Sequence, residues 1–352
     1  MIGNLDLQAL RRNEFRESKI RGKFMVSIRV PGSMFPAHLL PIVQEIATKY
    51  GSGKIHMQTR QKLSIPDILY KDVDAVNKML EPIIEELEVK VCGIELPKLD
   101  NGYATIGARN IMNCIGSYHC TFANADTISL ARKLEKDIYP NDYHIKIGIA
   151  GCPNDCAKAN FCDFGIMGIS KIDWDYNRCV GCGACVKECK QHVTSALYAV
   201  NGKAAKQFDK CIGCGACVKV CPTMAWSRNP TKYYWVKIGG RTGKQTPRAG
   251  KTMFMWITEE PMRQIVRNIF MFQDYMLQGK PVYRHFGHLI DEGSYRVFKE
   301  FILGISEEAK ANHVPEVHLN DECLVADRVY WDEDETVARI HLKNMGPNKV
   351  VK

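Results

Sequence analysis

The N-terminal region alternates between β-type and helical patterns of apolar and polar side chains. Residues 23–30 are rich in β-branched, alternating side chains and stop at a Pro-Gly pair, which predicts a strand and a turn. Residues 36–50 place apolar side chains at helical spacing and end at Gly51, which predicts a helix. A strand over 54–65 and an amphipathic helix over 71–87 follow. This order predicts a small α+β lobe.

The remainder of the chain continues with mixed elements. The pattern predicts strands over 143–149 and 232–239 and a helix over 260–277. This helix carries an apolar stripe that we assign to the protein core rather than to a cofactor, formed by Met262, Ile265, Val266, Ile269 and Met276. Residues 304–352 are acidic in the middle, and we interpret them as a docking arm or an interface strand.

Composition is that of an ordinary globular protein. The 352 residues suffice for two or three domains, and the apolar (45%) and charged (25%) fractions argue against a disordered chain. No apolar run approaches the ~20 residues of a membrane span, and the first residues contain no apolar signal-peptide region. We therefore expect a cytoplasmic protein. The net charge of +9 first suggests a polyanionic partner, but no Lys/Arg cluster or helix-turn-helix pattern supports nucleic-acid binding.

Fifteen cysteines are the more informative feature. The cytoplasm keeps thiols reduced, so this number indicates metal binding rather than disulfides. Two runs have the spacing Cys-x2-Cys-x2-Cys-x3-Cys, which is typical of bacterial ferredoxins with [4Fe–4S] clusters. The first run contains Cys179, Cys182, Cys185 and Cys189, and the second contains Cys211, Cys214, Cys217 and Cys221.

In such paired runs the fourth cysteine of each run binds the cluster of the other. We therefore assign Cys221 to the cluster of the first run and Cys189 to the cluster of the second. A pair of zinc knuckles is the alternative, although zinc sites rarely use four cysteines at such short spacing. The first run lacks the proline that usually follows its last cysteine, which affects only the local turn.

A third, looser set of cysteines has the pattern Cys-x5-Cys and then Cys-x3-Cys. It consists of Cys114, Cys120, Cys152 and Cys156. Taken alone, these residues fit structural zinc or buried thiols as well as an iron–sulfur cluster. The two ferredoxin-type runs elsewhere in the chain favour a third iron–sulfur site.

The order of this third set resembles the cluster motif of the sirohaem nitrite and sulfite reductases. Three other segments resemble the same family: a Thr-x-Arg-Gln signature with Gln58 in place of the threonine, an Arg-Asn pair before the first cysteine, and an aromatic, Gly-Gly, Pro-Arg segment over 232–250. The resemblance covers residues 20 to about 303. The inserted ferredoxin runs are most similar to those of the anaerobic and dissimilatory sulfite reductases within the family.

For the fold, the resemblance implies an α+β protein with a ferredoxin-like lobe, a sirohaem and [4Fe–4S] domain, and an inserted bacterial-type 2[4Fe–4S] ferredoxin domain. The expected boundaries are 1–98 for the N-terminal lobe, 99–170 with 225–303 for the sirohaem domain, 171–224 for the insert and 304–352 for the tail. For cofactors, the resemblance implies sirohaem and three [4Fe–4S] clusters. Cys156 is then the thiolate shared by the third cluster and the sirohaem iron.

The resemblance also implies roles for individual residues around an anionic substrate. The candidates for oxyanion binding are Arg60, Arg109 and Lys146, with His144 as a proton donor where the family usually has a lysine. The candidates for cofactor binding are Gln61, Asn110, Gly239, Gly240, Arg241 and Arg248. Surface charges or bonds to cofactor carboxylates are the alternatives for the basic groups, and an ordinary hairpin turn is the alternative for the glycine–arginine segment.

The activity implied is the six-electron reduction of sulfite to sulfide, with electrons relayed through the two ferredoxin clusters. Nitrite reduction and a non-catalytic electron-transfer subunit are the alternatives. The chain contains no Gly-x-Gly-x-x-Gly fingerprint for a nicotinamide or flavin, so we expect electron-delivering partners, an iron–sulfur subunit and a flavin or NAD(P)H subunit. The family's longer enzymes contain the α+β unit twice, which predicts a homodimer or a paralogous partner, with Arg60 or Lys146 acting across the interface.

Cluster binding also changes the meaning of the net charge. Four thiolates around an oxidised [4Fe–4S] core leave a charge of about −2, so three clusters lower +9 to about +3. The carboxylates of sirohaem and an anionic substrate compensate for the rest. We therefore interpret the basic excess as compensation for the protein's own cofactors.

Overall fold

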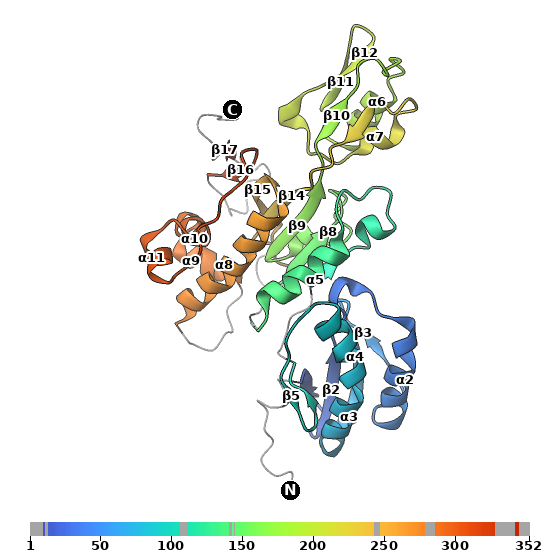
Figure 1. The fold of residues 1–352 in the computed structure, drawn as a ribbon, viewed down its shortest axis with the longest axis vertical. Coiled ribbons are helices and arrows are strands. Elements are labelled where there is room, and N and C mark those ends of the chain that lie inside the picture. Colours follow the sequence, from blue (N-terminus) through green and yellow to red (C-terminus); the bar gives the residue numbers. More distant parts are fainter. Residues whose placement is uncertain are drawn as a thin grey trace. The chain divides into compact units, whose positions relative to one another are not determined.

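The computed structural model describes most of the chain as a mixture of helices and strands (Figure 1). The residues described are 10, 13–105, 111–140, 143, 145–242, 247–278, 286–327 and the backbone of 342–344. The chain divides into two compact units, Met1–Met112 with Ile128–His144 and Asn113–Thr127 with Ile145–Lys352. The predicted α+β class is thus confirmed, and each unit is described by itself.

The first unit contains an antiparallel four-stranded sheet in the order β1-β2-β4-β3. Its strands are β1 (Phe15–Glu17), β2 (Lys23–Ile28), β3 (His56–Met57) and β4 (Leu63–Leu69). The single strand predicted over 54–65 is wrong, because the chain turns there to form the β3–β4 hairpin. The backbone N–H of Gln58 donates to the Lys62 carbonyl at 2.9 Å, and Gln61 adopts a left-handed φ of 60°.

The helices of this unit are α2 (Leu40–Lys49), α3 (Val73–Met79), α4 (Glu81–Ile84), a π-helical turn (Glu85–Lys90) and most of α5 (Thr127–Ile138). The helix predicted over 71–87 is therefore divided. Pro82 explains the break, because it lacks an N–H and its ring is tolerated only in a first helical turn, here that of α4. Val43, Ile46 and Ile83 form part of the fully buried core below the sheet strands.

The second unit is built on a seven-stranded sheet in the order β17-β16-β15-β14-β9-β8-β7. Its strands are β7 (Met112–Asn113), β8 (Ile147–Ala150), β9 (Phe164–Ile169), β14 (Tyr233–Ile238), β15 (Lys251–Ile257), β16 (Leu324–Ala326) and β17 (Leu342–Asn344). β8 and β9 are parallel, whereas β9, β14, β15 and β16 pair antiparallel in succession. Part of the predicted tail thus lies inside the sheet as β16.

Between the neighbouring strands β9 and β14, the chain makes a long excursion that carries eight cysteines. Its elements are β10 (Ile172–Trp174), α6 (Ala184–His192), β11 (Leu197–Val200), β12 (Lys203–Lys206), α7 (Ala216–Val220) and β13 (Trp226–Arg228). β10 pairs with β13 and β11 pairs with β12, both antiparallel. Ile172, Leu197 and Trp226 form a small core together with several of the cysteines.

Four helices complete the second unit: α8 (Glu259–Leu277), α9 (Phe286–Gly293), α10 (Tyr295–Ile302) and α11 (Glu307–Ala311). α8 and α10 pack through edge-to-face aromatic pairs centred on Phe272, whose ring centroid lies 5.1 Å from that of Phe298 and 5.4 Å from that of Phe301. The core role predicted for the α8 stripe is confirmed, since four of its residues are buried and Met276 is half-buried.

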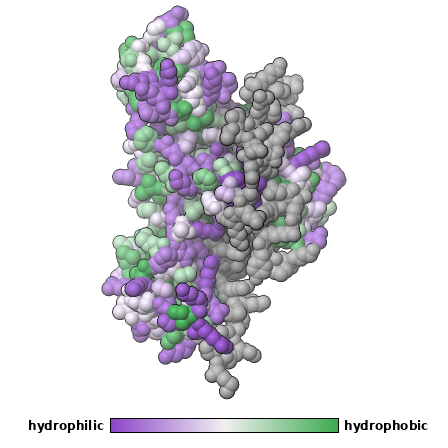
Figure 2. Space-filling view, turned by 180° about the vertical axis from the view of Figure 1, so that it is seen from behind, coloured by the Kyte–Doolittle hydropathy of each residue, from purple (hydrophilic) through white to green (hydrophobic). Residues whose placement is uncertain are grey.

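The described surface is mainly hydrophilic, and its apolar residues form separate small patches on the face that Figure 2 shows. Among the described residues, no helix combines the length and the apolar composition that crossing a bilayer requires.

Candidate functional site

Cys114, Cys120, Cys152 and Cys156 come together in the second unit, where β7 and β8 end. Burial raises the pKa of the Cys152 thiol, and the charges of Cys120, Cys114 and Cys156 raise it further, so the four thiols lie near one another. The backbone N–H of Gly151 donates to Cys114 Sγ at 3.1 Å. Such amide bonds stabilise a thiolate, so this set can hold an iron–sulfur cluster.

The loop after Cys152 is fixed by a single carboxylate. Asp155 accepts hydrogen bonds from the backbone N–H groups of Ala159, at 2.6 Å, and Asn160, at 3.0 Å. Burial lowers the pKa of Lys237 on β14, while the charge of Asp155 acts in the opposite direction. These hydrogen bonds fix the backbone directly before and after the exposed Cys156.

The glycine–arginine segment lies against this same loop. A Cβ at Gly240 would come within 2.4 Å of the Asn160 carbonyl oxygen, so only glycine permits the close approach. Arg241 and Arg248 exchange backbone hydrogen bonds of 2.9 Å in each direction, and Arg248 Nε donates to the Gly239 carbonyl at 2.9 Å. The backbones of Arg241 and Arg248 therefore pair antiparallel, within the unit that holds the cysteines.

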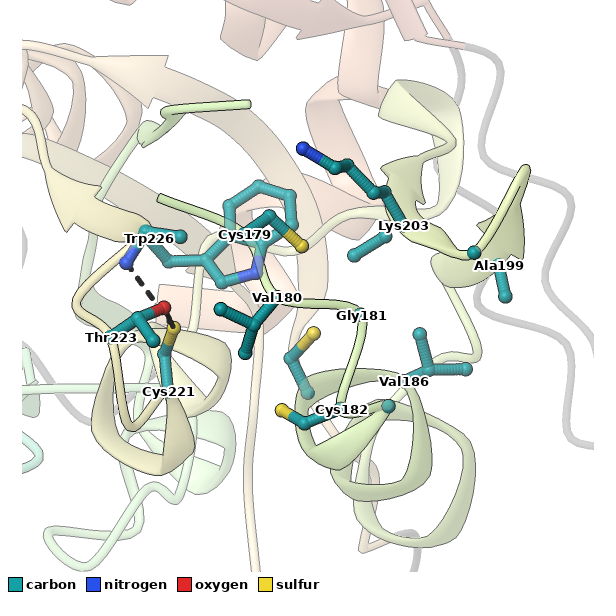
Figure 3. Close-up of a pocket in the computed structure, with 15 residues that line it drawn as sticks. Cys179, Val180, Gly181, Cys182, Val186, Ala199, Lys203, Cys221, Thr223 and Trp226 are labelled. Atoms are coloured by element: carbon teal, nitrogen blue, oxygen red, sulfur yellow. Dashed lines mark hydrogen bonds between the residues drawn. The ribbon is translucent and has the colours of Figure 1, made fainter. Parts of the chain in front are cut away.

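Cysteines of the two ferredoxin-type runs line a first cavity (Figure 3). The cysteines that line it are Cys179, Cys182, Cys185 and Cys221. Backbone N–H groups of Ala204 and Gly181 lower the pKa of Cys179, with smaller contributions from the Lys203 charge and the Trp174 side chain. Hydrogen bonds from these backbone amides thus favour the thiolate form of Cys179.

A second cavity is lined by Cys189, Cys211, Cys214 and Cys217. Burial raises the pKa of Cys214, and it raises the pKa of Cys217 to about 12 with help from the charges of Cys214 and Cys211. Thiols with such pKa values become thiolates only when a metal or cluster supplies positive charge.

The distribution of cysteines between the two cavities is crossed. Cys221 of the second run lines the first cavity, and Cys189 of the first run lines the second cavity. Four thiolates around one cavity suit a cluster with an iron at each corner. Among the residues that the structure describes, no three His, Cys, Asp or Glu side chains converge on a single metal ion.

The predicted anion-binding residues are divided between the two units. Lys146 directly precedes β8 and is half-buried, with its backbone N–H donating to the Asp163 carboxylate at 2.8 Å. Arg60 and Gln61 lie in the β3–β4 turn of the first unit, and Ser33 Oγ donates to the Gln61 side-chain oxygen at 2.5 Å. Arg109, Asn110 and His144 lie outside the described residues.

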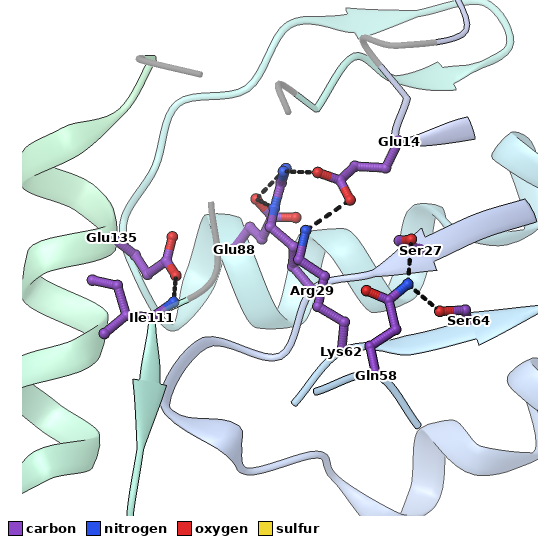
Figure 4. Close-up of polar contacts among 9 residues, drawn as sticks. All are labelled: Glu14, Ser27, Arg29, Gln58, Lys62, Ser64, Glu88, Ile111 and Glu135. Carbon is purple, nitrogen blue, oxygen red and sulfur yellow. Dashed lines mark hydrogen bonds and ion pairs between the residues drawn. The ribbon is translucent and has the colours of Figure 1, made fainter. Parts of the chain in front are cut away.

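A buried network of charges in the first unit was missed by the sequence reasoning (Figure 4). Arg29 forms 3.0 Å ion pairs with both Glu14 and Glu88, and Lys62 forms a 2.8 Å pair with Glu14. Burial opposes the charge of Arg29, but Glu88 and Glu14 outweigh it and raise its pKa. The sequence does contain one signal for this network. Arg29 lies near the end of a strand with alternating apolar residues, and an arginine that is buried there needs an acidic partner.

Comparison with known proteins adds an independent line of argument. The model of the nitrite and sulphite reductase 4Fe-4S domain matches residues 105–310, and that of the nitrite/sulfite reductase ferredoxin-like half domain matches residues 17–83. One subunit of the anaerobic sulfite reductase of Salmonella typhimurium is 50% identical to the chain, covering 97% of it and 98% of the relative.

Two further matches are more distant. The coenzyme F420-dependent sulfite reductase of Methanocaldococcus jannaschii is 29% identical, over 68% of this chain and 36% of that protein. The crystal structure of dissimilatory sulfite reductase I has a TM-score of 0.60 at 18% identity, covering 90% of this chain and 75% of that chain. The second match is a likeness of fold.

Proposed function

Because the chain belongs to the nitrite and sulphite reductase family, we propose that it is the catalytic subunit of a sirohaem-dependent sulfite reductase. The reaction is the six-electron reduction of sulfite to sulfide. The observation that carries the proposal is the gathering of three sets of four cysteines in one compact unit.

In this proposal, each set of cysteines holds one [4Fe–4S] cluster. Cys114, Cys120, Cys152 and Cys156 hold the core cluster, and the two cavities of the excursion, taken as an inserted ferredoxin domain, hold the others. Cys156 would hold sirohaem, which would supply the iron redox chemistry for the reduction of sulfite. Arg241 and Arg248, with Gln61 and Asn110, bind the carboxylates of the macrocycle.

The chain's own contribution to chemistry is the handling of negative charge and protons. Lys146 and Arg60, together with Arg109, bind the sulfite oxygens and neutralise their charge. His144 donates protons to the oxygen atoms that leave as water. Lys146 is supported for this role by its position immediately before β8, the strand that leads into Cys152.

The Salmonella relative is named as one subunit of an enzyme, which supports the expectation of partner chains. We propose that an iron–sulfur subunit and a flavin or NAD(P)H subunit deliver the electrons. A second copy of this chain, or a paralogue, completes the substrate pocket. Sulfite is the small-molecule substrate, and the site requires neither nucleic acid nor membrane.

An optical spectrum of the anaerobically purified protein, with iron and sulfide counts, tests the proposal. We expect sirohaem bands and about twelve cluster irons per chain, four for each cluster. The variant Cys114→Ser should lose about four irons and retain the other eight, whereas Cys92→Ser, at a buried cysteine outside the three sets, should retain all twelve. About eight irons in the unaltered protein and no tetrapyrrole bands would overturn the catalytic role in favour of an electron-transfer subunit.

Substrate preference requires a separate measurement. Steady-state assays with a reduced dye should give a higher kcat/KM for sulfite than for nitrite. The reverse order would assign the site to nitrite reduction.

A further inference from the structure

Asn124 lies in the loop that carries Cys114 and Cys120, here called the core cysteine loop, at the point where this loop meets the excursion between β9 and β14. It is 4% exposed, and it is four residues beyond Cys120. Its backbone N–H donates to the Gly151 carbonyl at 2.6 Å, immediately before Cys152. The main chain of Asn124 thus contacts the core cysteine set, which consists of Cys114, Cys120, Cys152 and Cys156.

The side chain of Asn124 reaches the loop that lines the second cavity. Its Nδ2 atom carries two hydrogens and faces the carbonyl oxygens of Gly213 at 3.3 Å, Cys214 at 3.4 Å and Gly168 at 3.1 Å. Its Oδ1 atom accepts a 2.8 Å hydrogen bond from Arg228 Nε. All polar atoms of this buried amide are therefore used, and two of its partners lie in the loop that carries Cys211, Cys214 and Cys217.

The loop around Gly213 is also held from its other sides. Ser170 N donates to the Gly213 carbonyl at 2.9 Å, at the point where the chain leaves the sheet. Gly213 has a φ of +66°, and a Cβ there would lie 2.7 Å from the Trp256 ring and 2.8 Å from the Ser170 carbonyl. The loop can approach the sheet this closely because residue 213 is a glycine.

A second contact joins the same two regions at the surface. The ammonium of Lys219, on α7 between Cys217 and Cys221, lies 3.4 Å from the ring centroid of Phe122. Phe122 is two residues beyond Cys120. This cation–π contact joins α7 to the core cysteine loop independently of Asn124.

The first cavity has a different environment. Cys182 is exposed there, and the neighbouring Val180 is 68% exposed. Solvent therefore reaches the first cavity, whereas the loop of the second cavity is bound to the core cysteine loop. The two ferredoxin-type sites are thus distinguishable by position, one accessible from outside and one joined to the core.

From these contacts we infer that Asn124 is a positioning residue that joins the second cavity directly to the core cysteine set, so that electrons enter at the first cavity and leave from the second. The path runs from Cys214 through its carbonyl to the Asn124 amide, and from the Asn124 N–H through the Gly151 carbonyl to Cys152. Each transfer oxidises the cluster at the second cavity by one electron and reduces the core by one electron, and no bond forms or breaks. The inference rests on the proposed function.

The test compares Asn124→Asp with the unaltered holoprotein. Aspartate keeps the acceptor for Arg228 but cannot donate to the carbonyl oxygens of Gly213 and Cys214, nor to that of Gly168, so it removes the amide contacts of residue 124 to the loop of the second cavity and to β9. Arg228→Lys is the second variant, because it loosens the same contact without altering Asn124. Asn229→Ala is the matched control, since the side chain of that neighbouring asparagine donates to Asp173 at the surface, at 3.3 Å.

Two readouts are measured on samples with equal iron content. The first is the magnetic coupling between cluster signals in the EPR spectrum of the fully reduced protein, and the second is the rate at which the core is reduced after rapid mixing with a donor. We expect Asn124→Asp and Arg228→Lys to weaken the coupling and slow core reduction at least tenfold, and Asn229→Ala to change neither. A fully loaded Asn124→Asp protein with unchanged coupling and rate would overturn the inference.

The two proposals fail in distinguishable ways. An unaltered protein without tetrapyrrole bands contradicts the proposed catalytic role, but its EPR coupling still reports on Asn124. A protein with sirohaem and twelve irons whose coupling ignores both substitutions contradicts only the role of Asn124.

Discussion

Trp174 and Trp226 lie opposite each other in the β10–β13 pair, with stacked rings whose centroids are 5.7 Å apart and whose planes are inclined by 26°. Trp226 lines the first cavity (Figure 3). Burial raises the pKa of Cys185, whereas the Trp226 side chain acts in the opposite direction by hydrogen bonding to its sulfur. The stacked pair therefore holds the Trp226 indole beside Cys185, which is a cluster ligand in the proposed function.

Trp226→Phe should lower the reduction potential of the cluster at the first cavity. Hydrogen bonds to the sulfurs of a cluster raise its potential, and phenylalanine keeps the stacking but removes the donor. Loss of a bond of about 1 kcal/mol corresponds to a shift of roughly 40 mV for one electron. A redox titration followed by EPR measures the shift.

The control for this experiment is Trp235→Phe. The Trp235 N–H donates to Thr252 Oγ1 at 2.7 Å, within the sheet, so the same substitution removes an indole bond elsewhere. It should leave the potential at the first cavity unchanged. An equal shift in both variants would contradict the role of Trp226.

Crossed ligation predicts that two serine substitutions alter different EPR signals. Cys221→Ser should alter the EPR signal whose potential responds to Trp226→Phe, because Cys221 lines the first cavity. Cys189→Ser should alter the other ferredoxin-type signal, because Cys189 lines the second. If Cys189→Ser altered the first signal instead, each run would bind its own cluster and the crossed assignment would be wrong.

The cysteine groups could be predicted from sequence because their spacing encodes them locally. The apolar stripe of α8 could be predicted for the same reason, since helical periodicity shows which side is buried. The hairpin at Gln58–Gln61 was missed because β-type residues on both sides of a four-residue turn read as one strand. The Asn124 contacts were not predictable, because the residues they join, Gly151 and Gly213, are distant in sequence and meet only in the fold.

The buried charge network of the first unit predicts an unusually large stability loss. In Glu14→Gln, Arg29 keeps Glu88, but Lys62 loses its carboxylate partner. Breaking a buried pair on one side leaves an uncompensated charge and costs about 3–5 kcal/mol. Hydrogen exchange of the β2 and β4 amides should show a correspondingly lower opening free energy.

An exposed ion pair in the same sheet provides the comparison. Lys23 and Asp67 form a 3.1 Å pair with side chains that are 36% and 32% exposed. Lys23→Gln should therefore lower the opening free energy of the same amides by less than about 1 kcal/mol. Equal losses of opening free energy in the two variants would show that burial of the Glu14 network does not increase its contribution to stability.

Lys62 predicts how the stability of the first unit depends on pH. Burial lowers its pKa below the ordinary value, and the charge of Glu14 only partly offsets this. Between the lowered pKa of the folded state and the higher pKa of the unfolded state, the unfolded chain binds more protons, so the free energy of unfolding rises with pH in that window. Lys62→Met removes the titrating group. As pH rises from neutral toward 10, the urea midpoint of the unaltered protein should therefore increase relative to that of Lys62→Met. A difference that stays constant over this range would contradict a lowered pKa for Lys62.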